Sequence, residues 1–71
     1  MTTESTSVGE DFPKQQKRVR DILKLYYEIG PSGAFAAAMM EQVLTEAEEA
    51  VAGGDIVEIL SSYQSLKEIE A

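Results

Sequence analysis

The sequence predicts an all-α fold, either a small bundle of three helices or a helical hairpin that dimerises. Two short glycine-containing segments, residues 30–33 and 53–54, divide the chain into three stretches. Within each stretch apolar residues recur every three or four positions, the spacing that places them on one face of a helix. No part of residues 12–70 alternates apolar and polar side chains as a half-buried strand does. We expect the three helices at residues 13–29, 32–52 and 56–69.

The first helix is expected to begin at Pro13. Proline suits the first turn of a helix because no N–H partner is needed there, and Asp11 or Phe12 is the expected cap. One apolar stripe follows the helix at Val19, Ile22, Leu23, Tyr26 and Ile29. Residues 1–10 are mostly threonine, serine and glutamate, a composition typical of a disordered tail. The remaining residues, 11–71, are expected to form a single three-helix domain.

The segment 30–33 is expected to form a tight corner between the first two helices. Gly30 can close a helix C-terminus in a left-handed backbone conformation, and Pro31 cannot continue the helix that precedes it. Ser32 can accept hydrogen bonds from the free N–H groups of the next helix. Gly33 has no side chain, so the two helix backbones can approach closely there.

The second helix carries a broad apolar stripe, and its first half is apolar on nearly all sides. A stripe of this width is typical of a helix that contacts neighbours on two sides, with Phe35 as its first large anchor. A chain of 71 residues buries a modest core, and this one has no cysteine for a disulfide. We therefore expect a homo-oligomer, a dimer. The candidates for self-association are Phe35, Met39, Met40 and Val43.

The turn before the third helix carries the clearest helix start in the chain. Gly53 and Gly54 are expected to end the second helix in a left-handed conformation. Asp55 is followed three positions later by Glu58, which is the pattern of a capping box. The apolar stripe of the third helix consists of Ile56, Ile59, Leu60, Tyr63 and Leu66.

Composition disfavours several classes of function. A formal net charge of −7 opposes binding to nucleic-acid phosphates or to anionic membranes. Without cysteine or histidine, the usual zinc sites and thiol chemistry are excluded. No apolar run approaches the roughly 20 residues that cross a bilayer. We expect a cytoplasmic protein that is not an enzyme, with no cofactor, metal, membrane or direct nucleic-acid partner.

An unidentified protein is the expected partner. Leu25 and Tyr27 fall outside the stripe of the first helix and are the first candidates to contact it, since tyrosine is enriched at binding hot spots. Arg18 is a further candidate, from residues 12–24, which hold five basic residues against one acid. The acidic face of the second helix adds Glu41, Glu46, Glu48 and Glu49.

Two alternative functions remain open. Free N–H groups at a helix N-terminus attract anions, so Ser32 and Gly33 could hold a small anionic ligand such as a nucleotide at the corner of an oligomer. The segment matches neither the GxxxxGKS/T phosphate loop nor the GxGxxG fingerprint. The second alternative is an acidic mimic of nucleic acid, which would occupy a DNA-binding enzyme through the same four glutamates.

Several segments together resemble a group of short, uncharacterised helical proteins encoded in tailed bacteriophages and prophages. The resemblance lies in residues 12–16 (FPKQQ), 29–35 (IGPSGAF) and 53–56 (GGDI), with Tyr26 and the Ser62-Tyr63 pair. It covers residues 12–70. Phage accessory proteins of this size are often small helical binders that block a host enzyme or defence component. The resemblance therefore implies binding to a host protein that is inhibited or modulated, and it supplies no catalytic residue.

Overall fold

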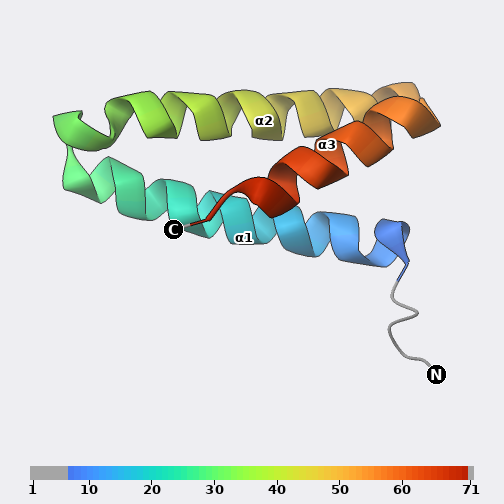
Figure 1. Ribbon diagram of the computed structural model, residues 1–71, viewed down its shortest axis with the longest axis horizontal. Helices are drawn as coiled ribbons and strands as arrows, with labels where there is room; N and C mark the ends of the chain where they lie inside the picture. The colour runs from blue at the N-terminus through green and yellow to red at the C-terminus, as the bar shows by residue number, and fades with distance from the viewer. Residues whose placement is uncertain (1–6, 71) are drawn as a thin grey trace.

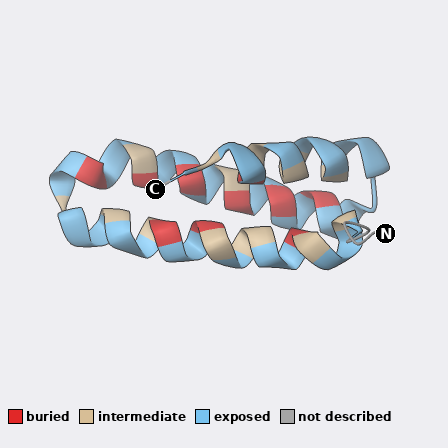
Figure 2. Cartoon of the chain, turned by 60° about the horizontal axis from the view of Figure 1, so that its bottom comes forward, coloured by how far each residue is buried: buried red, intermediate tan, exposed pale blue. Residues whose placement is uncertain are grey.

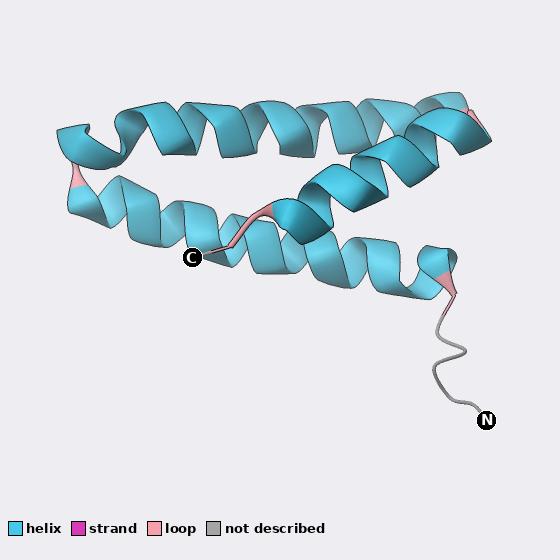
Figure 3. Cartoon of the chain, in the orientation of Figure 1, coloured by secondary structure: helices cyan, strands magenta, loops and turns pink. Residues whose placement is uncertain are grey.

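The computed structural model describes residues 7–70 and places them in three α-helices and one short 3-10 helix. Their order is α1 (Val8–Ile29), η2 (Pro31–Gly33), α2 (Ala34–Gly53) and α3 (Ile56–Glu68). Helices α1 and α2 lie side by side as an antiparallel hairpin, and α3 crosses back over them (Figure 1). Only short connections separate the helices (Figure 3). The prediction of an all-α three-helix bundle is confirmed, and residues 7–70 contain no strand.

The bundle has two dissimilar ends. The corner is the end where α1 turns into α2 through η2. The open end is the opposite one, where α1 begins and α2 turns into α3 (Figure 1). Helix α3 has 13 residues against 20 in α2, about 20 Å against about 30 Å of helix. Because α3 starts at the open end, it stops before it reaches the corner.

Helix α1 begins five residues before its predicted start. Ser7 is the cap, and its Oγ accepts a hydrogen bond from the N–H of Glu10 at 3.2 Å. Pro13 therefore lies inside the helix, and the prediction that Asp11 or Phe12 caps it was wrong. The position of a proline locates the first residue of a helix only to within a turn or two, which explains the error. Of the predicted tail, residues 8–10 are helical, and residues 1–6 lie outside the described part of the chain.

The corner depends on two glycines. Gly30 has φ 89° and ψ −148°, a backbone region that is almost restricted to glycine. Gly33 is buried, and a Cβ added there would stand 2.6 Å from the carbonyl oxygen of Tyr26. The close backbone approach expected at Gly33 is thus present. Ser32 is exposed and makes no capping hydrogen bond, because α2 starts two residues later than predicted, after Gly33.

The second turn follows the sequence prediction at Gly54 and Asp55 but not at Gly53, which is the last residue of α2 and not left-handed. Gly54 is left-handed, with φ 73°, and its N–H donates to the carbonyls of Ala50 and Val51. The carboxylate of Asp55 then accepts from the N–H groups of Val57 and Glu58 at 2.9 and 3.3 Å. Helix α3 therefore starts at Ile56, as the Asp55 signal predicts, and ends within one residue of the expected Ile69.

The core is one stripe between the three helices, seen as the buried positions in Figure 2. Its buried members are Phe12, Val19 and Ile22 on α1, Met40, Leu44 and Ala47 on α2, and Leu66 on α3. The stripe on α2 is narrower than predicted, because Phe35, Met39 and Val51 are exposed. Phe35, the expected anchor, has 79% of its surface exposed. Helical spacing marks every apolar face, whether or not a neighbouring helix covers it. The short α3 covers only part of the apolar face of α2.

Candidate functional site

Arg18 fastens the end of α3 to α1. Its two terminal nitrogens donate to the carbonyl oxygens of Ile69 and Leu66 at 2.8 and 2.7 Å, and its Nε donates to Gln15 at 2.8 Å. The last carbonyls of a helix have no partner within the helix, so a guanidinium satisfies them well. Arg18 was predicted to contact a partner, and the structure engages its side chain within the fold instead. The basic side chain alone gave no signal of this contact with α3.

Asp11 and Tyr63 join α1 to α3 nearer the open end. The phenol of Tyr63 donates to the Asp11 carboxylate at 2.6 Å, and Gln15 donates to the same oxygen at 3.1 Å. The Tyr63 ring stacks on Phe12 with centroids 6.2 Å apart, and the Lys67 ammonium lies 5.1 Å from its centre. The hydrogen bond from Tyr63 lowers the pKa of Asp11 and raises the pKa of Tyr63. These contacts hold α3 in place.

A hollow of about 250 Å³ opens beyond the end of α3, and we call it the corner hollow. Three of the four predicted self-association residues, Met39, Met40 and Val43, line it. Met40 is only 6% exposed, so most of its side chain belongs to the core. Phe35 lies one helical turn before Met39 and projects into solvent. The full lining consists of Tyr26, Ala36, Met39, Met40, Val43, Ile69 and Glu70.

Leu25 and Tyr27, the first candidates for partner contact, are both about half exposed. They stand two positions apart on α1, a spacing that does not face one side of a helix. The two residues therefore do not form the single surface that their pairing as partner-contact candidates suggested. Tyr27 lines a second hollow of about 500 Å³ at the corner, together with Tyr26, Gly30, Pro31, Ala34, Ala37, Ala38 and Glu41.

The second hollow has the wrong charge for an anionic ligand. Its one charged lining residue is Glu41, whose carboxylate would repel a phosphate. Ser32 and Gly33, predicted as weak anion-binding residues, do not line it. The space that a side chain at Gly33 would need is occupied by the carbonyl oxygen of Tyr26. The geometry thus offers no support for a nucleotide at this corner.

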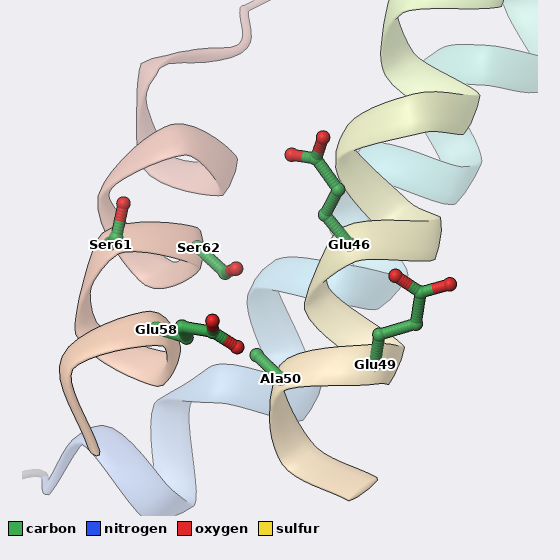
Figure 4. Close-up of a pocket in the computed structure, with 6 residues that line it drawn as sticks. All are labelled: Glu46, Glu49, Ala50, Glu58, Ser61 and Ser62. Atoms are coloured by element: carbon green, nitrogen blue, oxygen red, sulfur yellow. The ribbon is translucent and has the colours of Figure 1, made fainter. Parts of the chain in front are cut away.

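The four glutamates predicted to form one acidic face are divided among three places. Glu41 lies at the second corner hollow, and Glu48 pairs with Arg20 on α1 at 3.3 Å. Glu46 and Glu49 line a furrow between α2 and α3, where Glu58 of α3 joins them (Figure 4). We call this the acidic furrow; Ala50, Ser61 and Ser62 complete its lining. A row of carboxylates that imitates a nucleic-acid backbone is therefore not formed by these four residues.

An apolar groove of about 370 Å³ lies at the open end, and the sequence pattern did not reveal it. All three helices contribute to it, and none of the lining residues in the described range 7–70 is charged. Its lining consists of Val8, Gly9, Phe12, Pro13, Val51, Ile56, Ile59 and Leu60. The sequence analysis placed Ile56, Ile59 and Leu60 on the apolar stripe of the third helix, because core and groove positions share the same helical spacing.

Within residues 7–70, no cluster of three or more acidic side chains is arranged to hold a metal ion. No helix in that part of the chain is long and apolar enough to span a membrane. Among known proteins, no family model, no curated protein and no solved structure matches the chain. The exposed apolar surfaces and the distribution of charge therefore carry the functional conclusion.

Proposed function

We propose that the protein is a non-enzymatic helical module that binds other proteins and forms a homodimer. The observation that supports this most directly is the amount of large apolar surface left outside the core. Within residues 7–70, nine large hydrophobic side chains are about half exposed or more, and they belong to the corner and the open end. Isolated exposed apolar residues are ordinary on a soluble domain, whereas a gathering of them is typical of an interaction site.

Self-association is proposed to use the corner hollow. Phe35 offers a large exposed ring next to a hollow that α3 leaves uncovered. When a protruding side chain and a hollow lie at the same end of a molecule, two copies related by a two-fold axis can each insert the side chain into the hollow of the other. Each Phe35 ring would then enter the hollow of the other copy, between Met39 and Val43. The flexible methionine can adapt its shape to the ring.

A role in phage biology extends this proposal. The resemblance to short proteins of tailed phages and prophages supports a host protein as the bound partner, which would be inhibited or modulated. We propose a cytoplasmic setting, in keeping with a sequence that has no cysteine.

The test is the solution mass across a concentration series, measured by light scattering behind a sizing column. We expect twice the 7.8 kDa mass of the chain, and a monomer for Phe35→Ser. Val57→Ser is the matched control, because Val57 is 75% exposed at the open end, close to the 79% of Phe35. A wild-type monomer at every concentration, or equal effects of the two variants, would contradict dimerisation through the corner.

A further inference from the structure

The first turns of α3 are the most exposed apolar part of the open end. Ile56 is 66% exposed and Val57 is 75% exposed, and Leu60 follows on the next turn, about half exposed. Val51, on the last turn of α2, is also half exposed. Three of these residues, Val51, Ile56 and Leu60, line the apolar groove.

Helix α3 separates this groove from the acidic furrow. Ile56, Ile59 and Leu60 line the groove, whereas Glu58, Ser61 and Ser62 line the furrow. Across the furrow stand Glu46 and Glu49 of α2, both exposed (Figure 4). A ligand lying over the start of α3 would therefore meet an apolar surface on one side of the helix and three carboxylates on the other.

We propose that the open end binds an amphipathic helix of another protein, one that carries lysine or arginine beside its apolar face. This inference rests on the proposed function and specifies the partner of one of its surfaces. An apolar groove accepts the i, i+3, i+4 and i+7 side chains of such a helix. The carboxylates of Glu46, Glu49 and Glu58 complement its basic side chains, which favours fast association and fixes its orientation.

A second copy of the chain fits this end less well than a basic helix does. Two-fold pairing through the groove would bring two acidic furrows together, and like charges at an interface oppose association. The chain's own basic residues lie mainly on α1, whose apolar stripe is already in the core through Phe12, Val19 and Ile22. Beside these basic residues α1 therefore has no free apolar face, and its exposed apolar residues, Leu25, Tyr27 and Ile29, lie at the corner end of the helix.

The test uses a labelled synthetic peptide of roughly 18 residues, five helical turns, with leucine at i, i+3, i+4 and i+7 and lysine elsewhere. Fluorescence anisotropy with the full chain measures its affinity. We expect saturable binding that weakens as salt is raised. A peptide with glutamate in place of lysine should bind at least about tenfold more weakly, and so should a peptide of the same composition without helical spacing.

Variants of the chain locate the binding. Leu60→Gln removes an apolar contact in the groove, and Glu49→Lys reverses a charge in the furrow. Each substitution should lower the affinity for the lysine peptide by about tenfold. Glu28→Lys is the matched control, because it changes the net charge equally at an exposed position of α1 near the corner. We expect it to change the affinity less than about threefold. Circular dichroism confirms that each variant remains helical.

The inference would be overturned by no saturable binding, by equal binding of the glutamate peptide, or by an equal loss in Glu28→Lys and Glu49→Lys. The last would mean attraction by net charge alone. These outcomes leave dimerisation through the corner untouched, since Phe35→Ser tests that separately. Peptide binding that is lost in Phe35→Ser but kept in Leu60→Gln would also overturn it, by placing the peptide at the corner.

Discussion

The two ends of the bundle are held by different kinds of contact. At the corner, the main chain is decisive, because Gly30 adopts a backbone conformation that other residues rarely take and Gly33 packs on the carbonyl of Tyr26. At the open end, side chains are decisive: Asp55 caps α3, and Asp11 binds Tyr63. The corner geometry is therefore sensitive to a side chain at either glycine, whereas the open end depends on a few polar bonds.

The ends also differ in charge beside their exposed apolar surfaces. The open end combines its apolar groove with a furrow of three glutamates. Among residues 7–70, Glu70 is the one charged residue that lines the corner hollow. Low charge suits pairing of identical surfaces, while an acidic surface opposes it and favours a basic partner. One small domain can thus separate self-association from partner binding by placing the two surfaces at opposite ends.

The largest expected effect is at the corner. In Gly33→Ala the new Cβ would meet the Tyr26 carbonyl oxygen at 2.6 Å, and backbone atoms must move apart. We expect a loss of about 1 to 3 kcal/mol in the free energy of unfolding, measured by urea denaturation. Gly53→Ala is the control, because no atom lies within 4 Å of a Cβ there. That change should stabilise the helix by a few tenths to about 1 kcal/mol. Equal losses would contradict the main-chain account of the corner.

The next effect concerns how far α3 extends along the hairpin. Arg18→Ala removes the donors to the carbonyls of Leu66 and Ile69. We expect a loss of about 1 to 2 kcal/mol, with faster hydrogen exchange in the last turn of α3. Arg18→Lys should recover only part of the loss, because an ammonium cannot reproduce the two-pronged guanidinium contact. An unchanged exchange rate in α3 would show that the clamp contributes nothing in solution.

The sequence predicted the fold better than the surfaces. Helical spacing and the Asp55 signal place the helices, since both are local properties of the chain. Exposure of Phe35 and the role of Arg18 depend on where α3 stops along α1, and no local pattern contains that information. The apolar groove was missed for a related reason: Ile56 and Leu60 have core spacing, but both are exposed at the open end.

A pH dependence should mark the attachment of α3 at the open end. The hydrogen bond from Tyr63 lowers the pKa of Asp11 below its ordinary value of 3.8 in the folded state. The stabilisation from this hydrogen bond is therefore present above about pH 4, and it is lost as the pH falls through the lowered pKa of Asp11. The same bond raises the pKa of Tyr63 above 10.0, so its stabilisation is also lost as the pH rises through that raised value.

Tyr63→Phe isolates this contribution, because it keeps the ring that stacks on Phe12 and removes the hydroxyl. We expect the variant to be less stable than the wild type between about pH 4 and pH 10, with the difference shrinking on both sides of that window. Urea denaturation at a series of pH values measures it. A difference that stays constant down to pH 2 would mean that the Asp11 carboxylate is not the partner.

The smallest effect is expected for the ion pair that joins α1 and α2 between the two ends. Arg20 and Glu48 are 3.3 Å apart, and both side chains are about half exposed. Exposed pairs of this kind contribute about 0.2 to 1 kcal/mol, and salt screens them. A double-mutant cycle with Arg20→Gln and Glu48→Gln should give a coupling energy in that range that falls at high salt. A larger coupling energy that salt does not reduce would contradict this expectation. It would mean that the ion pair, and not only backbone packing at the glycine corner, aligns α1 with α2.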